Sequence, residues 1–155
     1  MKHNFYVLCG IPGSGKSTWL EKNAHGFAIS RDAIRFKYIT NAEDYFSKEP
    51  MVLKEFYADI KKYLDANESD VYADATHLSL KGRNELFKAL GTSIANHNVI
   101  ALAFVANPRI CIERSYKRTG LSIVPAPVIM RMFKSYVMPN PDKETNFNEV
   151  RVINT

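Results

Sequence analysis

The residues best suited to chemistry form a glycine-rich segment near the start of the chain. Residues 10–17 read GIPGSGKS; they follow an apolar run at residues 5–9 and open a helical pattern at residues 16–22. Glycine permits a tight turn that brings backbone N–H groups close to phosphate oxygens, and a helix N-terminus adds partial positive charge. The G-x-x-x-x-G-K-[ST] spacing between a strand and a helix therefore predicts a binding site for the phosphates of a nucleoside triphosphate.

The side chains of this segment have distinct expected roles. In sites of this kind the lysine reaches the β- and γ-phosphates and the following hydroxyl binds Mg²⁺. We therefore expect ATP and Mg²⁺ as cofactors, with Lys16 acting in catalysis and Ser17 holding the metal. The residues expected to contact ATP are Gly10, Gly13, Ser14, Gly15, Lys16, Ser17 and Thr18.

An acid and a base three positions apart, Asp32 and Arg35, follow the next apolar run at residues 27–29. One interpretation is an ordinary helix start, with Ser30 as the N-cap and an intrahelical ion pair. The other is an acceptor site, in which Asp32 takes the proton of an alcohol and Arg35 holds a second phosphate. Ligands of parallel sheets collect at the carboxyl ends of the strands, where the glycine-rich segment also lies, so the second interpretation is favoured.

Further charged residues are expected to complete the site. Asp74 ends an apolar run, at the position where an acid holds Mg²⁺ or its waters. Arg114 and Arg118 are four residues apart and share a helix face, from which they are expected to stabilise charge developing on the transferred phosphoryl group. Thr76 and His77 are expected to be a surface hydroxyl and a solvated imidazole.

Short apolar runs alternate with helical patterns along the chain. Apolar residues spaced for a helix are Leu53, Phe56, Tyr57, Ile60 and Leu64, and again Leu80, Leu86, Phe87 and Leu90. This alternation predicts a mostly parallel sheet covered on both faces, in a single domain over residues 1–155. Residues 119–127 and 139–148 are expected to be loops, the first closing over the nucleotide. The expected strands are residues 5–9, 27–29, 71–73, 99–105 and 150–153.

The composition is that of a water-soluble domain. Hydrophobic residues make up 46% of the 155 residues, and the formal net charge is +5. No apolar run reaches the length of a membrane span and no export signal is evident, so we expect a cytoplasmic protein without a membrane partner. Cys9 and Cys111 lie in apolar runs and are expected to be buried, reduced thiols. The cationic excess across residues 109–134 is of the kind that attracts phosphates.

Several segments together resemble the polynucleotide 5′-hydroxyl kinase family. Residues 10–19 (GIPGSGKSTW) are similar to the family's phosphate-binding loop, and residues 30–35 (SRDAIR) to its acceptor motif. Residues 73–83 (ADATHLSLKGR) resemble its acidic segment. Residues 113–120 (ERSYKRTG) and 124–136 (VPAPVIMRMFKSY) are similar to its arginine-bearing lid and to the helix behind the lid. The chain departs from the family in carrying His77 where relatives often have asparagine, and in lacking a phosphatase half.

The resemblance implies both a fold and roles for individual residues. The implied fold is the P-loop kinase three-layer α/β sandwich, with a five-stranded, mostly parallel sheet in the order 2-3-1-4-5 and an arginine-bearing lid. It implies that Asp32 is the general base and that Arg35 grips the 3′-phosphate next to the acceptor hydroxyl. It also implies that the partner is a single-stranded 5′-hydroxyl end of DNA or RNA.

The sequence is consistent with three functions. The first is an ATP- and Mg²⁺-dependent kinase of 5′-hydroxyl ends of single-stranded DNA or RNA. The second is a kinase whose acceptor is a small molecule, such as a sugar or a nucleoside, or an aminoacylated RNA. The third is a nucleotide-binding interaction module, or an ATPase that drives assembly, in which Asp32 positions water or has no role.

Overall fold

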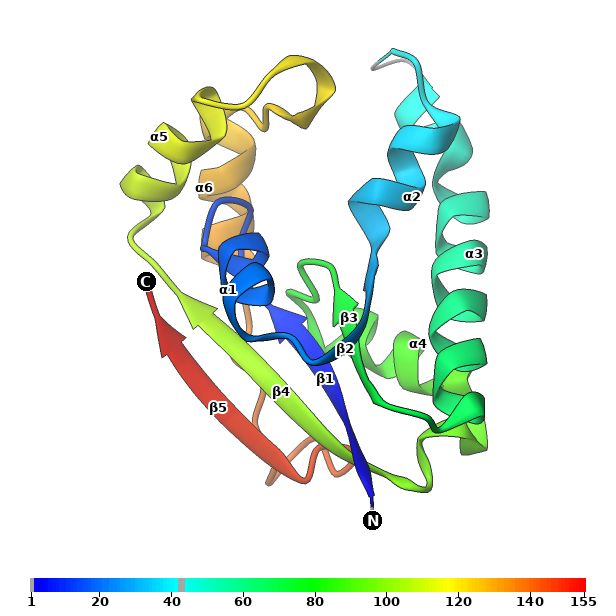
Figure 1. The fold of residues 1–155 in the computed structure, drawn as a ribbon. Helices are drawn as coiled ribbons and strands as arrows, with labels where there is room; N and C mark the ends of the chain where they lie inside the picture. Colours follow the sequence, from blue (N-terminus) through cyan, green and yellow to red (C-terminus); the bar gives the residue numbers. More distant parts are fainter. Residues whose placement is uncertain (1, 42–43) are drawn as a thin grey trace.

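Within residues 2–41 and 44–155, which the computed structural model describes, five strands form one sheet (Figure 1). The strands are β1 (His3–Cys9), β2 (Gly26–Ser30), β3 (Asp70–Asp74), β4 (His97–Val105) and β5 (Glu149–Asn154). Their order is β2-β3-β1-β4-β5, and the four pairings are all parallel. The order and the five strand positions predicted from the sequence are confirmed.

The continuous apolar sequence of β1 reflects its place at the centre of the sheet. Phe5 lies beside Val71 on β3 and beside Val99 on β4, and all three side chains are buried. A parallel strand covered on both faces needs apolar side chains at successive positions, not only at alternate ones. β1 therefore has a fixed register, and its carboxyl end delivers the glycine-rich segment to one edge of the sheet.

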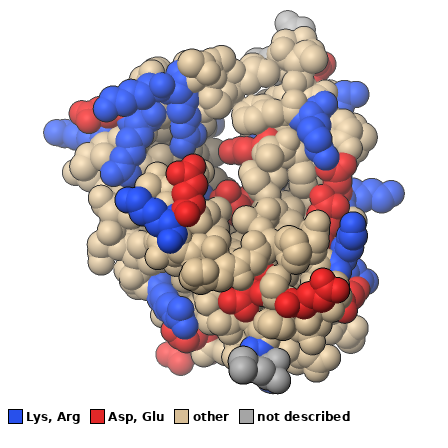
Figure 2. Space-filling model, viewed as in Figure 1, with Lys and Arg blue, Asp and Glu red and all other residues tan. Residues whose placement is uncertain are grey.

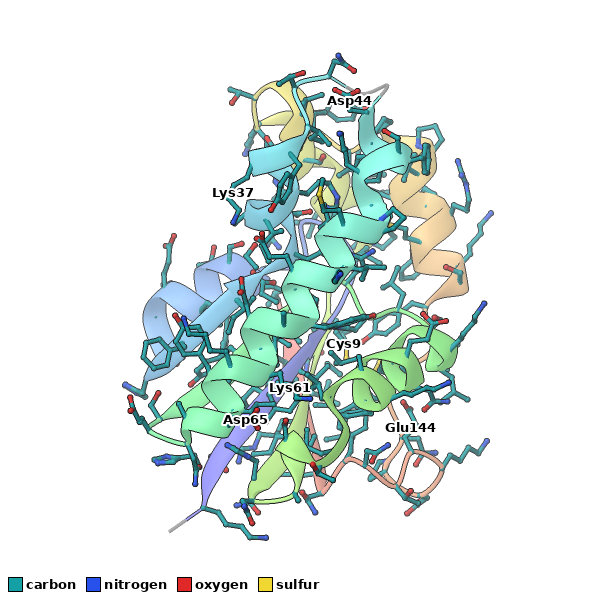
Figure 3. All side chains as sticks on the ribbon, turned by 90° about the vertical axis from the view of Figure 1, so that its right-hand side faces the viewer. Cys9, Lys37, Asp44, Lys61, Asp65 and Glu144 are labelled. Carbon is teal, nitrogen blue, oxygen red and sulfur yellow. The ribbon has the colours of Figure 1, made fainter. Side chains whose placement is uncertain are left out.

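Helices cover both faces of the sheet, as predicted. On one face Phe56 and Val7 belong to the larger core cluster, and on the other Trp19 packs against the cluster that contains Leu8. Figure 3 shows the longest helix lying across the first face, with Asp44 near its upper end and Asp65 near its lower end. The helices are α1 (Lys16–Asn23), α2 (Arg31–Tyr38), α3 (Tyr45–Ala66), α4 (Leu80–Leu90), α5 (Pro108–Tyr116) and α6 (Ala126–Ser135).

Side-chain caps fix where the helices at the site begin. The Ser30 hydroxyl accepts a hydrogen bond from the Ala33 N–H at 3.1 Å, so the cap predicted for α2 is confirmed. Ser79 caps α4 in the same way at 3.0 Å. An N-cap side chain satisfies one of the backbone N–H groups that the first turn leaves unpaired. These caps place the first turns of α2 and α4 at the same edge of the sheet as the glycine-rich segment.

The segment between α5 and α6 stands above this edge (Figure 1). The loop predicted at residues 119–127 is present, although it contains a single 3₁₀ turn at Gly120–Ser122 and α6 begins at Ala126. The Ser115 hydroxyl holds the loop to α5 by bonding both the N–H and the carbonyl of Val124 at 2.8 Å. The loop is therefore anchored on the side of α5 and faces the tip formed by α2 and α3.

The expectation of a solvated His77 imidazole is wrong. His77 is only 9% exposed, and its Nδ1–H donates to the Leu8 carbonyl at 2.6 Å. Burial lowers the pKa of His77 to about 4, although the hydrogen bond to Leu8 opposes this shift. A neutral imidazole therefore joins the segment after β3 to the end of β1, below the glycine-rich segment.

Arg83 and Glu144 form a buried ion pair behind the same segment. The Arg83 side chain is inaccessible to solvent; its Nε donates to Glu144 at 2.7 Å and its Nη1 to the His77 carbonyl at 2.8 Å. Cys9 and Cys111 are buried free thiols, as predicted. In the part of the chain that the structure describes, no helix combines the length and the apolar character needed to cross a membrane.

Candidate functional site

The glycine-rich segment forms a tight loop between β1 and α1 that only glycine can build at two positions. Gly13 and Gly15 have φ values of 81° and 95°, in the left-handed region that side chains disfavour. A Cβ at Gly13 would also lie 2.6 Å from the Cys111 carbonyl oxygen. The loop is closed at its start by a hydrogen bond from the Gly10 N–H to the Thr76 carbonyl at 2.9 Å.

Lys16 occupies the centre of this loop. Its Nζ donates to the Gly10 and Ile11 carbonyls at 2.7 and 3.0 Å. Burial lowers the pKa of Lys16 to about 8, and the carboxylates of Asp74 and Asp32 oppose that shift. Both acids are therefore close enough to act on the lysine, which brings together three residues that the sequence predicted to share one site.

Two distant side chains hold the outer side of the loop. The Arg114 Nη1 donates to the Gly13 carbonyl at 2.9 Å, and the Thr155 hydroxyl donates to the Ser14 carbonyl at 2.6 Å. In a trans peptide the N–H points opposite to the carbonyl, so tying the Ser14 oxygen outward aims the N–H of Gly15 into the cradle. No pattern in the sequence marks Thr155, and Arg114, which was expected to contact phosphate, instead donates to the loop backbone.

The residues proposed for Mg²⁺ come from the first turn of α1 and from the end of β3. The Ser17 and Thr18 side chains are exposed in the first turn of α1, and Asp74 ends β3. Burial raises the pKa of Asp74 to about 6, although the charge of Lys16 opposes the shift. A carboxylate and a hydroxyl are the oxygen ligands that Mg²⁺ prefers, and a cation would stabilise the ionised form of Asp74. The donor set therefore fits this metal.

Asp32 lies at the start of α2 with an accessible carboxylate. Its side chain is 65% exposed and pairs with Arg35, one turn further along the helix. The Asp32 charge acts on both Lys16 and Asp74, and Ser30 at the end of β2 pairs with Asp74, so α2 begins near the phosphate cradle. The ion pair expected of an ordinary helix start is thus present, and so is the proximity to the loop that an acceptor site requires.

Arg35 is buried and strongly paired. It is 6% exposed, and its Nε and Nη2 donate to the two oxygens of Glu49 at 3.0 and 2.9 Å. Arg31 pairs with the same carboxylate. Although burial raises the pKa of Glu49, hydrogen bonds from Arg35 and Arg31 outweigh it and hold that pKa below its usual value. Glu49, on α3, is a site residue that sequence analysis missed.

Arg118 lies beyond the end of α5, whose C-cap is Lys117, so the expectation that Arg114 and Arg118 share a helix face is wrong. Its side chain is half-buried, and its charge contributes to lowering the pKa of Lys16, after burial as the main cause. Figure 2 shows Lys and Arg side chains gathered over α5, with the surface hollowed between that side and α2. The structure therefore places Arg118 near the lysine that would bind the phosphates.

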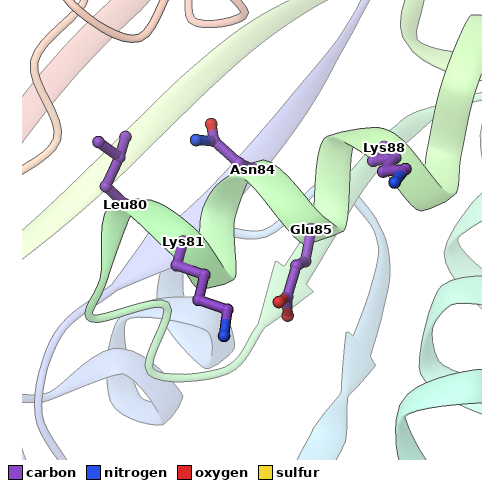
Figure 4. Close-up of a pocket in the computed structure, with 5 residues that line it drawn as sticks. All are labelled: Leu80, Lys81, Asn84, Glu85 and Lys88. Atoms are coloured by element: carbon purple, nitrogen blue, oxygen red, sulfur yellow. The ribbon is translucent and has the colours of Figure 1, made fainter.

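Two depressions lie beside α4. One, of about 210 Å³, lies between α3 and the segment joining β3 to α4, and Arg31 and Thr76 contribute to its wall. The other is shown in Figure 4 and contains none of the predicted site residues. It is lined by Leu80, Lys81, Asn84, Glu85 and Lys88. Only the first depression adjoins the site, because Arg31 immediately precedes Asp32 in α2.

The fold and the loop define the class of the protein, which has the α/β fold of P-loop kinases. The family model described as an AAA domain matches residues 6–139, so the chain belongs to this family. No curated protein is similar to the chain at a significant level.

Solved structures with this fold differ in function. A putative kinase from Chloroflexus aurantiacus superposes with a TM-score of 0.74 at 14% identity, covering 100% of this chain and 89% of its own. A chain of the Pnkp1/Rnl/Hen1 RNA repair complex has a TM-score of 0.69 at 21% identity, over 86% of this chain and 44% of its own. A sugar kinase from Janibacter sp. has a TM-score of 0.60 at 19% identity, covering 98% and 85%. At these identities the likeness shows the fold alone.

Proposed function

We propose that the protein transfers the γ-phosphate of ATP to the 5′-hydroxyl end of single-stranded DNA or RNA. The observation that carries this proposal is the position of Asp32. Its exposed carboxylate follows β2, whose last residue Ser30 pairs with Asp74 at the edge of the sheet that carries the phosphate loop, and it is ion-paired with Arg35. A further support is that one protein of the same fold comes from an RNA repair complex.

The nucleotide half of the mechanism depends on groups already arranged around the loop. The N–H groups of Gly15 and of the first turn of α1 would bind the phosphates, and Lys16 would exchange its contacts with Gly10 and Ile11 for phosphate oxygens. Arg118 would stabilise negative charge as it moves to the β–γ bridging oxygen. Ser17 and Asp74 would hold Mg²⁺, which supplies charge neutralisation for the phosphates when bound.

In the acceptor half, Asp32 would accept a hydrogen bond from the alcohol and aim its oxygen at the γ-phosphorus. A carboxylate is far too weak a base to ionise an alcohol before the reaction. The bond from the acceptor oxygen to phosphorus therefore forms, and the bond to the bridging oxygen of ADP breaks, before the proton passes to Asp32. Orientation is the main contribution of this residue.

The ion pairs of Arg35 favour a second candidate function, a kinase with an uncharged acceptor. Its guanidinium is already paired with Glu49 and Asp32, so an acceptor phosphate would have to replace a carboxylate that holds it. An uncharged acceptor such as a sugar needs no such exchange, and a sugar kinase shares the fold. A kinase of a small-molecule hydroxyl is therefore the alternative that the pairing of Arg35 favours.

Labelling with γ-³²P-ATP distinguishes these candidates. We expect label on 5′-hydroxyl oligonucleotides and none on oligonucleotides that already carry a 5′-phosphate. Asp32→Asn should lower kcat by about 100-fold or more, because a positioned general base contributes that much, while ATP affinity stays unchanged. Label on sugars or nucleosides alone would establish the small-molecule function, and ATP hydrolysis indifferent to every acceptor would contradict both kinase functions.

A further inference from the structure

Two aromatic side chains at the start of α3 are exposed and take no part in the hydrophobic core. Phe46 is 85% exposed, the largest exposed fraction among the large apolar side chains of the described residues, and Tyr45 is 36% exposed. Neither ring belongs to a hydrophobic cluster of the described core. Large apolar side chains left in water at the edge of a site are typical of a binding surface.

A chain of contacts links these rings to Asp32. The Arg35 guanidinium pairs with Asp32 on one side and lies 4.6 Å from the centre of the Tyr45 ring on another. The Tyr45 and Phe46 rings are 5.4 Å apart and meet edge to face. The order of neighbouring groups is therefore carboxylate, guanidinium, first ring and second ring.

The order matches the order of groups at the end of a nucleic acid strand. If the terminal hydroxyl lies at Asp32, the next phosphate along the strand lies at Arg35, and the base attached beyond that phosphate lies over the rings. Single-strand binding proteins combine cationic groups for the backbone with aromatic rings on which bases stack. Here Arg35 is the cationic group, and the Tyr45 and Phe46 rings lie beside it.

We propose that Tyr45 and Phe46 form a stacking platform for the base of the second nucleotide of a single-stranded acceptor. The proposal rests on the function proposed above and adds to it the part of the substrate that the protein recognises beyond the reacting end. Phe46 supplies the exposed face, and Tyr45 fixes the position of Phe46 relative to Arg35.

The test compares two acceptors that differ only in one base. Both are 5′-hydroxyl dinucleotides with a 3′-terminal phosphate; one carries a base at the second position and the other is abasic there. Base stacking on an aromatic side chain corresponds to about 5- to 150-fold in affinity. We expect the wild-type kcat/KM to favour the complete dinucleotide by a factor in this range, and a nucleoside 3′-phosphate to react like the abasic compound.

Variants of Phe46 separate stacking from other effects. Phe46→Ala should lower kcat/KM for the complete dinucleotide by a factor in the same range, leaving the abasic compound unaffected, and Phe46→Trp should restore the preference. Phe133→Ala, which removes an exposed phenylalanine from α6, is the matched control and should change neither value. In a titration with 2-aminopurine at the second position, wild type and Phe46→Trp should quench the fluorescence, and Phe46→Ala should not.

The possible results separate the platform from the proposed function. Equal rates with both dinucleotides in wild type and Phe46→Ala would overturn the platform while leaving the kinase function intact. No label on any nucleic acid end would overturn the proposed function, and the platform with it. A wild-type dimer that Phe46→Ala dissociates, with unchanged acceptor kinetics, would assign the rings to contact with a second copy and would also overturn the platform.

Discussion

Burial shifts the pKa values of Lys16 and Asp74 in opposite directions. Burial disfavours the charged form of each, so it lowers the pKa of Lys16 to about 8 and raises the pKa of Asp74 to about 6. Each charge partly offsets the shift of the other, which shows that the two residues interact. Both must be ionised for the proposed reaction, because the ammonium attracts phosphates and the carboxylate attracts Mg²⁺.

These two pKa values predict the pH dependence of the reaction. The kcat/KM for ATP should be maximal between about pH 6 and pH 8, because Asp74 is protonated below this range and Lys16 is neutral above it. The measurement is kcat/KM from acid to alkaline pH at a low, constant concentration of free Mg²⁺, because a bound cation would lower the pKa of Asp74. Asp74→Asn should be less active and should lack the acidic limb, which distinguishes Asp74 from the titration of ATP itself. A wild-type profile that stays flat through pH 6 would contradict the assignment.

At the scale of elements, the residue that follows β5 holds the loop that follows β1. β5 ends beside the loop, and the Thr155 hydroxyl holds the Ser14 carbonyl from a distance of 141 residues in sequence. Gly15 has no Cβ, and one built there would lie 3.1 Å from the Thr155 methyl group. The conformation of the nucleotide loop thus depends on an element whose sequence contains no nucleotide-binding motif.

Removing this hydroxyl should weaken ATP binding without changing catalysis. Thr155→Val keeps the shape of the side chain but loses one hydrogen bond, a loss of about 1 kcal/mol that corresponds to about 5-fold in Kd. We expect the KM and the directly measured Kd for ATP to rise by about that factor while kcat is unchanged. Thr155→Ser should restore both values; if it behaves like Thr155→Val, the packing of the methyl group and not the hydroxyl is responsible.

Most of the elements, but few of their tertiary contacts, were predictable from the sequence. Buried parallel strands have continuous apolar sequences, so the sheet could be predicted. The spacing of the glycine-rich loop marks the end of the first strand, so the positions of Lys16 and Asp32 at one edge of the sheet could be predicted as well. Glu49 was missed because its pairing with Arg35 joins two helices and leaves no local pattern. His77 was assigned to solvent because nothing in its neighbouring residues marks the bond to Leu8, 69 positions away.

At the scale of the whole molecule, the buried pair of Arg83 and Glu144 joins α4 to the segment before β5. The bond spans 61 residues, and Glu144 also accepts a hydrogen bond from the Asn140 N–H at 3.0 Å. Figure 3 shows Glu144 low in the molecule, away from the edge where α2 begins. The pair therefore affects the stability of the fold and lies outside the proposed reaction.

Breaking this pair should destabilise the protein strongly. Glu144→Gln leaves the Arg83 charge buried without a counter-ion, which typically lowers the free energy of unfolding by about 3–5 kcal/mol. Urea unfolding of the two single variants, Glu144→Gln and Arg83→Met, and of the double variant measures the coupling. We expect the free energy of unfolding of the double variant to fall by clearly less than the sum of the decreases in the two single variants. Strict additivity would show that the two charges do not stabilise each other.

The position of β1 in the middle of the sheet has a consequence for how the protein is made. β1 pairs with β3 and β4, and its loop is held by Arg114 and Thr155, so the parts that shape the cradle come from far along the chain. Non-local pairings of this kind form late. During synthesis the nucleotide motif therefore emerges well before the residues that hold its loop, and we expect full affinity for ATP only after Thr155 has left the ribosome.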